Sequence, residues 1–419
     1  MKNGMHSALK RVVLQSIFSL KGNFAEGLKP TVREFDGVEI TPFRGGAKGS
    51  ATISADFEIA WAFRGRSVEE RNLRAVRCRK NVPYLVRILE ETSIPITWAT
   101  VGHLFLESCE RGVYGLAHAD MPRPPKNERW EGDWYQHDPC TNVEKHPDWY
   151  APDLIQGILA SRTQHEIGSH SFSHIDFSAD TSSRELVRRE LKQCIQVMAP
   201  LGLPLRSLVY PFNNMGHHHL DIIADLGLTA VRHRDPRIRL SYPERSPDGV
   251  YKLWESMNMR RAGLYDYVEK AKIFLQQALR QKAAYHLWFH PSDPTEIFEN
   301  EFRRIIQYMA QLRDQGHLWV TTMGELAAYC EARQKFNLDV HWDSGSLRIR
   351  FESNYDLGRY GNTDVTLRIP LSRQPKKCRI RSAHAEQIID GKPEARDPSG
   401  GRFFVFNVPV TAREMEVVL

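Results

Sequence analysis

Short apolar runs alternate with helical patterns across residues 46–335, and this alternation limits the fold more than any other feature of the sequence. In its first unit, a strand-like run at 51–58 is followed by helical spacing at 68–91 and by a second apolar run at 96–102. Units of this kind link parallel strands through crossover helices. Because they recur over about 290 residues, the sequence predicts an α/β protein with a parallel sheet that is either doubly wound or closed as a barrel. Of these two, we expect a distorted (β/α) barrel of about seven strands.

The segments on either side of the predicted barrel have a different character. Residues 1–45 are expected to form an N-terminal extension. Apolar residues from Leu9 to Phe18 recur at helical spacing, which favours a helix packed on the barrel over a helix lying on a membrane surface. From residue 336 short alternating strands follow, and a hairpin signal at 343–345 joins the first two. We therefore expect residues 336–419 to form an all-β sandwich module.

The charge of the chain is mildly basic and spread along its length. The formal net charge is +6, and no long basic run marks a nucleic-acid-binding tail, so no nucleic-acid partner is expected. The first residues lack the continuous apolar stretch of a signal peptide, which predicts a cytoplasmic protein. Peripheral contact with the inner face of the membrane is left open. The six cysteines form no C-x-x-C pair and are expected to be free thiols.

Residues 106–150 interrupt the alternation with a stretch rich in Pro, Trp, Asp and His. An irregular insertion of this length in a compact domain is usually a functional loop or a lid. Trp134 is its best candidate for contact with a substrate.

Three motifs with reactive side chains each belong to a different predicted strand. HEIGSHSFSH places His170 and His174 four residues apart after one strand, and SADFE places Asp56 and Glu58 on one face of another. His290 ends a third strand in HLWFHP. Since parallel strands end at one face of a barrel, these side chains are expected to converge. Glu58, His170 and His174 would form a three-ligand metal site with a position open for water. Asp56 and His290 would remain as an acid–base pair.

A fourth motif, LVYPFNN, runs from a strand into a proline turn that can aim a backbone N–H into the cavity. Together the motifs resemble those of the polysaccharide deacetylase family, carbohydrate esterase family 4, over about residues 45–333. The resemblance implies hydrolysis of N-acetyl groups on amino sugars with a divalent metal, Zn²⁺ before Co²⁺ or Ni²⁺. It implies these roles: Asp56 as general base; Glu58, His170 and His174 as metal ligands; His290 as general acid; and the backbone N–H of Phe212 as an oxyanion donor.

Two positions depart from the pattern of the family. Phe57 separates the two carboxylates, which are adjacent aspartates in the usual first motif, and the second of them here is a glutamate. Val209 stands where the third motif usually carries an arginine that supports the base. The residues that could replace this arginine are Arg206, Arg232 and Arg260, and the weaker candidates for a supporting carboxylate are Asp235 and Glu255.

The sequence therefore predicts a metal-dependent deacetylase. Its expected partner is an N-acetylated glycan or glycan precursor in capsule, O-antigen or exopolysaccharide metabolism. Two alternatives stay open: hydrolysis of a small cyclic amide, which would release no acetate, and glycan binding without catalysis, which would need no metal. The oligomeric state and the role of the β module are not decided by the sequence.

Overall fold

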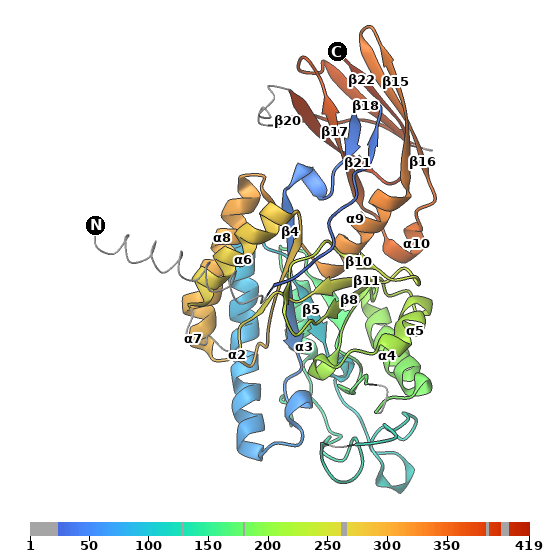
Figure 1. Ribbon diagram of the computed structural model, residues 1–419. Coiled ribbons are helices and arrows are strands. Elements are labelled where there is room, and N and C mark those ends of the chain that lie inside the picture. Colours follow the sequence, from blue (N-terminus) through green and yellow to red (C-terminus); the bar gives the residue numbers. More distant parts are fainter. Residues whose placement is uncertain (1–23, 128, 179–180, 261–265, 383–384, 395–401) are drawn as a thin grey trace, which may run out of the picture.

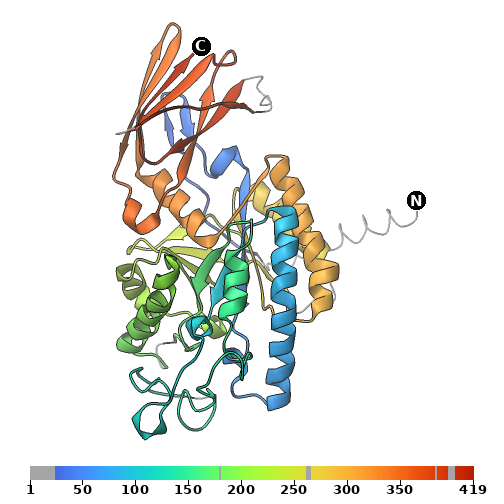
Figure 2. The same cartoon turned by 180° about the vertical axis from the view of Figure 1, so that it is seen from behind.

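The computed structural model describes residues 24–127, 129–178, 181–260, 266–382, 385–394 and 402–419. Within them the chain forms a curled sheet covered by helices and, beyond it, two antiparallel sheets (Figures 1 and 2). The α/β class expected from the sequence is confirmed. The segment from Leu9 to Phe18 lies outside the described residues, so the helix expected there stays a prediction.

The main sheet consists mostly of short parallel strands. Its strands follow the order β10-β11-β8-β7-β6-β5-β4-β13-β12, and β14 pairs with β4 beside this path. Only β10 with β11 is antiparallel among the pairs described for this sheet. The bounds are β4 (Gly49–Phe57), β5 (Thr97–Thr100), β6 (Glu166–Ser169), β7 (Ser207–Val209), β8 (Ala230–His233), β10 (Glu244–Arg245), β11 (Tyr251–Trp254), β12 (Met257–Asn258), β13 (Ala284–Phe289) and β14 (Leu318–Thr321).

The sheet curls so far that its two ends are joined by two residues. Strands β11 and β12 stand toward opposite ends of the strand order, yet only Glu255 and Ser256 separate them along the chain. The Glu255 N–H donates to the His233 carbonyl at 2.8 Å, and the Ser256 N–H donates to the His286 carbonyl at 2.9 Å. The connection is therefore hydrogen-bonded to β8 on one side and to β13 on the other. This curl turns the carboxyl ends of the strands toward a common centre.

Helices pack against the sheet, and several of them begin with a side-chain cap. Ser67 Oγ accepts a hydrogen bond from the Glu70 N–H at 3.2 Å at the start of α2, and Ser183 and Asp266 cap α4 and α6 in the same way. Each such cap contributes about 1 kcal/mol. The bounds are α2 (Val68–Thr92), α3 (Pro152–Leu159), α4 (Arg184–Met198), α5 (Leu220–Asp225), α6 (Tyr267–Gln281), α7 (Thr295–Ile297), α8 (Arg303–Asp314) and α9 (Met323–Lys335).

Two five-stranded antiparallel sheets form the C-terminal part, in the orders β15-β16-β22-β18-β19 and β2-β3-β17-β21-β20. Strands β2 and β3 come from the segment expected to be an N-terminal extension. Val38 and Ile40 of β3 are buried in the apolar core that the two sheets share. The bounds are β2 (Glu34–Phe35), β3 (Val38–Ile40), β15 (Phe336–Asp343), β16 (Ser346–Ser353), β17 (Asp364–Pro370), β18 (Lys377–Ser382), β19 (Glu386–Ile388), β20 (Lys392–Pro393), β21 (Phe403–Pro409) and β22 (Ala412–Val418).

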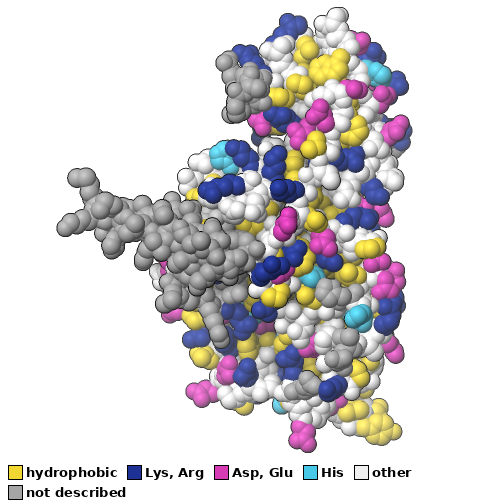
Figure 3. All heavy atoms as spheres, viewed as in Figure 1, with side chains coloured by type: hydrophobic (Ala, Val, Ile, Leu, Met, Phe, Trp, Pro, Cys, Tyr) yellow, Lys and Arg dark blue, Asp and Glu magenta, His cyan; other side chains and the backbone are white. Residues whose placement is uncertain are grey.

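Shorter elements complete the described chain. The helix α10 (Leu357–Tyr360) follows β16, and a parallel pair of strands is made by β1 (Phe24–Ala25) and β9 (Ile238–Arg239). The six cysteines are free, as expected, and four of them are buried. In the described residues no helix is both long and apolar enough to cross a membrane. Positive and negative side chains are interspersed over the face shown in Figure 3.

One buried arginine joins the N-terminal segment to the last barrel helix. Arg333 of α9 donates to the carbonyls of Ile40 at 3.2 Å, Thr41 at 3.0 Å and Thr31 at 2.5 Å, and its side chain is 1% exposed. The β module is built from the N-terminal segment and from the strands that follow α9. Because α9 continues directly into β15, this contact links both segments to the last helix of the barrel.

We predict that Arg333→Ala lowers the free energy of unfolding by about 2–4 kcal/mol, because three carbonyls lose a hydrogen bond in a buried place. Urea unfolding followed by circular dichroism measures this change. The matched control is Arg373→Ala, since Arg373 is exposed and a change within about 0.5 kcal/mol is expected there. Equal effects of the two substitutions would contradict this role of Arg333.

Candidate active site

Two carboxylates mark the carboxyl end of β4. Asp56 lies within the strand and Glu58 directly follows it, so both side chains point to the same side, and each residue is only 3% exposed. Thr52 and Ser54, on that same side of β4, place their hydroxyls 2.8 and 2.9 Å from the two ring nitrogens of His286. The barrel interior below the carboxylates is therefore polar, which is the environment that a buried charge requires.

The loop after β6 carries the two histidines of HEIGSHSFSH. Ser171 and His174 have left-handed backbone angles, with φ of 57° and 56°, and this coiling lets both imidazoles approach Glu58. Glu190 of α4 accepts hydrogen bonds from the Ser173 N–H at 2.8 Å and from its hydroxyl at 2.7 Å. Positive φ is unfavourable for residues with a side chain, so such contacts are needed to hold the loop.

Glu58, His170 and His174 bring three ligand atoms together. Oε2 of Glu58 lies 3.2 Å from Nε2 of His170 and 3.0 Å from Nε2 of His174. All three ligand atoms lie within 4.8 Å of one another. Ligands about 2.0–2.1 Å from a tetrahedral Zn²⁺ stand about 3.3 Å apart, so this spacing fits one cation. The three residues can hold a metal ion.

The surroundings of the imidazoles suit the same use. Nδ1 of His170 lies 2.8 Å from the Val209 carbonyl, and a proton on Nδ1 leaves the Nε2 lone pair directed at Glu58. Burial lowers the pKa of His174 to about 4, despite the nearby Glu58. Burial raises the pKa of Glu58, but the imidazoles of His290, His170 and His174 outweigh it and bring this pKa well below its usual value. A neutral imidazole and an ionised carboxylate are the forms that bind metal.

Asp56 lies beside this cluster and forms a two-pronged ion pair with Arg232 of β8. The two guanidinium nitrogens donate to the two carboxylate oxygens at 2.5 and 2.8 Å, and they also reach Ser54 Oγ at 3.0 Å and Asn213 Oδ1 at 2.8 Å. Burial raises the pKa of Asp56, but the charge and hydrogen bonds of Arg232, together with the imidazoles of His170 and His290, outweigh burial and bring the pKa below its usual value. Asp56 is therefore an ionised base at neutral pH.

His290 faces both carboxylates from the end of β13. Its Nε2 lies 3.4 Å from Glu58 Oε1 and 3.9 Å from Asp56 Oδ2. Asp293 lies behind the ring, with Oδ2 3.7 Å from Nδ1, and it accepts the His290 backbone N–H at 3.0 Å. Burial lowers the pKa of His290, but Glu58 and Asp293 outweigh it and raise the pKa above its usual value. This side chain is consequently suited to donate a proton.

A pocket of about 430 Å³ opens above these groups, and the six site residues predicted from the sequence all line it. Phe212 has a left-handed conformation, with φ of 61°, and its ring centroid lies 4.4 Å from that of His174. Trp61, Trp130 and Trp288 supply aromatic walls, and Arg66, Arg129 and Arg260 supply positive charge. The pocket thus combines a possible metal position, a base and an acid with surfaces that can hold a polar ring.

Some residues lie elsewhere than the sequence suggested. Trp134 does not line the pocket around Glu58: it is buried, its ring centroid lies 4.7 Å from that of Trp130, and its indole N–H donates to Ser173 Oγ at 2.9 Å. Arg206 lies in a separate hollow, beside Gly324.

The two weaker candidates for a supporting carboxylate differ in their partners. Asp235 pairs with Arg239 at 2.7 Å, whereas Glu255 pairs with Arg234 at 3.4 Å and also interacts electrostatically with Arg232 and Asp56. Asp293, which sequence reasoning missed, supports His290. The signal was present in the sequence, since Asp293 follows His290 by three residues in HPSD.

The comparisons with known proteins agree with the resemblance expected from the sequence. Residues 74–231 match the family model for polysaccharide deacetylases, which confirms that resemblance. The matched range contains His170, His174 and Phe212. Asp56 and Glu58 precede it, and His290 follows it. No curated protein matches the chain.

Three solved structures illustrate the range of similar folds. A Mycobacterium smegmatis protein, provisionally described as a polysaccharide deacetylase, is 16% identical, with 74% of this chain and 96% of that chain covered and a TM-score of 0.48. The family 4 carbohydrate esterase from Streptomyces lividans, solved in complex with acetate, is 11% identical, with 65% and 92% covered and a TM-score of 0.34. A CE4 family pseudoenzyme from Bacillus anthracis is 12% identical, with 68% and 66% covered and a TM-score of 0.35.

We predict that acid destabilises the protein in part through His286. Burial lowers the pKa of His286 to about 3, whereas an unfolded histidine titrates near 6.5. The unfolded chain therefore binds the extra proton, and stability that is present above pH ~6.5 is lost as the pH falls toward ~3, by up to about 1.4 kcal/mol per pH unit for this residue.

Urea unfolding of the wild type and of His286→Gln at about pH 7 and about pH 5 tests this expectation. Glutamine keeps hydrogen-bonding atoms but does not titrate, so the variant should lose less stability on acidification. His341→Gln, at an exposed histidine, should behave as the wild type. An unchanged pH dependence in His286→Gln would rule out the contribution of His286.

Proposed function

We propose that this chain, whose residues 74–231 match the polysaccharide deacetylase family, is a metal-dependent hydrolase that removes the N-acetyl group of an amino sugar. One observation supports the proposal above all: the ligand atoms of Glu58, His170 and His174 converge in a pocket that Asp56 and His290 also line. An amide is a weak electrophile with a poor leaving group, so its hydrolysis needs activation at the carbonyl, at the water and at the amine.

Glu58, His170 and His174 would hold a divalent cation, for which their donor set favours Zn²⁺ over harder ions, with Co²⁺ or Ni²⁺ as alternatives. When bound, this ion supplies Lewis acidity, which polarises a carbonyl and lowers the pKa of a coordinated water to about 7. Asp56 takes a proton from the attacking water. Arg232 holds both oxygens of Asp56, so the carboxylate stays ionised and fixed in direction during this step.

His290 gives a proton to the departing amine nitrogen. The carboxylates around it raise the pKa of His290, which favours the protonated ring, and Asp293 holds it in place through the backbone N–H and by facing Nδ1. The Phe212 backbone N–H is proposed as a donor to the oxyanion, a contact worth about 3–4 kcal/mol in other enzymes. The walls of the pocket orient the sugar ring and limit the entry of water.

The substrate class is narrowed by the positive charge around the pocket. A second hollow shares Asn213, Arg260 and Trp288 with the pocket. It is also lined by four further cations and two carboxylates, namely Arg74, Arg77, Arg234, Lys270, Glu255 and Asp293, so cations predominate. Aromatic rings with neighbouring cations suit a sugar that carries carboxylate or phosphate groups. We therefore propose an anionic N-acetylated glycan or a phosphate-linked glycan precursor, in capsule, O-antigen or exopolysaccharide metabolism. A cytoplasmic location, with peripheral contact at the inner membrane face left open, belongs to the same proposal.

The test measures acetate release and metal content in the same samples. We predict acetate release from N-acetylated anionic oligosaccharides above that from neutral ones. Asp56→Asn and His290→Gln should lower kcat by about 10²–10⁴ while the metal is retained, because they remove proton transfer only. His170→Ala and His174→Ala should lose both the metal and the activity. Amide ring opening without acetate would favour the cyclic-amide alternative, and metal-free binding of glycans without turnover would favour the non-catalytic one.

A second prediction concerns Arg232. Without its guanidinium group, only the imidazoles of His170 and His290 oppose the effect of burial, so the pKa of the Asp56 carboxyl rises. Arg232→Gln should therefore move the acid limb of the pH profile of kcat/KM to higher pH and lower kcat/KM at least about tenfold near pH 7. Arg206→Gln is the matched control, because Arg206 lies away from the pocket. An acid limb at the wild-type position in Arg232→Gln would exclude the proposed role.

A further inference from the structure

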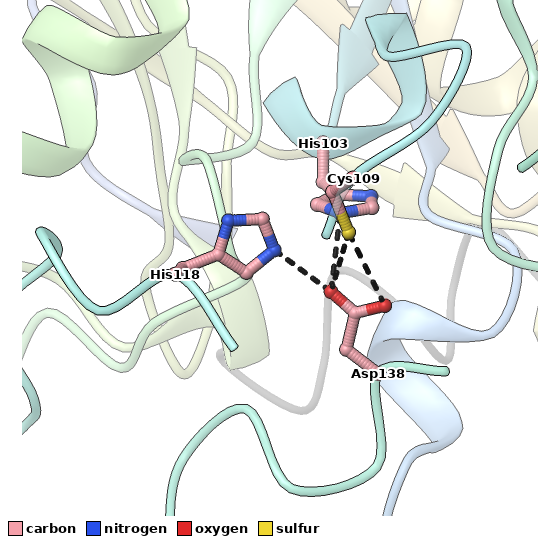
Figure 4. A group of neighbouring side chains, drawn as sticks. All are labelled: His103, Cys109, His118 and Asp138. Carbon is pink, nitrogen blue, oxygen red and sulfur yellow. Dashed lines mark hydrogen bonds and ion pairs between the residues drawn. The ribbon is translucent and has the colours of Figure 1, made fainter. Parts of the chain in front are cut away.

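A second group of metal-ligating side chains lies outside the proposed active site. It consists of His103, Cys109, His118 and Asp138 (Figure 4). His103 belongs to the 3-10 helix η3 (Gly102–Phe105) that follows β5, and the other three belong to the insertion at 106–150. Figure 4 shows the four side chains pointing toward one another. Neither the proposed mechanism nor the expected family roles use any of them.

The spacing of the four ligand atoms fits one ion. Asp138 Oδ2 lies 3.2 Å from His103 Nε2, 2.8 Å from His118 Nε2 and 3.6 Å from Cys109 Sγ. All four ligand atoms lie within 4.8 Å of one another. Nitrogen and oxygen ligands of tetrahedral Zn²⁺ stand about 3.3 Å apart, and the longer Zn–S bond of about 2.3 Å places sulfur slightly farther away. In the same way, Asp138 Oδ2 lies nearer to the two imidazole nitrogens than to the sulfur of Cys109.

The environment of the His103 imidazole is a second observation, besides the spacing, that points to a cation. His103 is 0% exposed, and its Nε2 forms no hydrogen bond within the described residues although Asp138 Oδ2 lies 3.2 Å away. Its Nδ1 lies 3.3 Å from the Trp149 carbonyl oxygen, which can only accept a hydrogen bond. A proton on Nδ1 leaves the Nε2 lone pair facing a buried carboxylate, which is unfavourable unless a cation lies between them.

We infer that His103, Cys109, His118 and Asp138 form a second metal site, which binds Zn²⁺ or a similar divalent ion in a structural role. Imidazole, thiolate and carboxylate are all ligand types of Zn²⁺, and four protein ligands close its tetrahedral coordination, as in structural zinc sites. His103 and Asp138 are buried, and none of the four lines the pocket over Asp56 and Glu58. The ion therefore has no position at which to meet that substrate.

This site would fix the insertion to the barrel. Cys109 and His118 flank a hairpin in which Arg111 pairs with Ala117, and the Arg111 side chain donates to the Asp138 carbonyl at 2.7 Å. Metal ligation at both ends of the hairpin would hold its base closed. The remaining ligand, His103, belongs to the barrel, so the ion would join the two parts.

The cluster also packs against the proposed active site. The ring centroid of His103 lies 4.5 Å from that of Trp61, which lines the pocket. The rings of His103 and His118 lie 5.8 and 5.6 Å from that of Phe172, within the loop that carries His170 and His174. A structural ion at this place would stiffen both a wall of the pocket and the histidine loop.

Cobalt spectroscopy on the full chain, produced in cobalt-supplemented medium, tests this inference. The Glu58, His170 and His174 set contains no sulfur, so sulfur-to-cobalt charge-transfer absorption in the near ultraviolet reports on Cys109 alone. We expect this absorption in the wild type, together with close to two equivalents of cobalt. Cys109→Ser should abolish the absorption and lower the cobalt content by about half.

Two further variants separate the outcomes. Cys140→Ser removes a second thiol of the same insertion that is outside the ligand set, and it should keep the absorption. His174→Ala should keep the absorption while losing the other equivalent of cobalt, so failure of the proposed deacetylase site would be visible separately. Absence of the absorption from cobalt-loaded wild type, its survival in Cys109→Ser or its loss in Cys140→Ser would each overturn the inference.

Discussion

The burial of two carboxylates at the end of β4 is the constraint on which the rest of the site depends. Asp56 and Glu58 are both almost inaccessible to water, and a buried negative charge is stable only beside positive charge or hydrogen-bond donors. Arg232 meets this need for Asp56 through a two-pronged contact. Glu58 has instead the imidazoles of His170, His174 and His290, an environment that a divalent cation would complete.

The architecture explains how these charges can meet. Asp56, His170, Arg232 and His290 come from four separate strands or the loops that follow them, and only a sheet that curls on itself brings those strand ends together. The polar ladder of Thr52, Ser54 and His286 continues the hydrogen bonding below the site. On the outside, the insertion at 106–150 contributes Trp130 and Arg129 to the pocket and packs against the histidine loop.

Sequence reasoning located the parts of the site that belong to strand ends and short motifs. It succeeded in grouping Asp56, Glu58, His170, His174, Phe212 and His290, because each is tied to its strand by a few residues and strand ends share one face of the barrel. Arg232 could only be weighed beside Arg206 and Arg260, since the three differ in tertiary position and not in local pattern. Trp134 could not be told from Trp130, because burial of an irregular loop leaves no periodic signal.

For the fold too, the sequence predicted the class and the regular elements but not the short strands or the long-range pairings. The strand–helix alternation gave the α/β class and most of the helices, whereas β11 and β12 are so short that no period is visible in their sequence. The pairing of β3 with β17 links residues more than 300 positions apart, and no local pattern reports such a contact.

The central claim is that Glu58, His170 and His174 surround one divalent cation. Anomalous X-ray scattering from crystals of the full chain, recorded on both sides of the zinc absorption edge, tests it most directly. The account predicts a zinc peak about 2.0–2.2 Å from Glu58 Oε2 and from Nε2 of both histidines. Protein saturated with zinc that shows no anomalous density among these three side chains would contradict it.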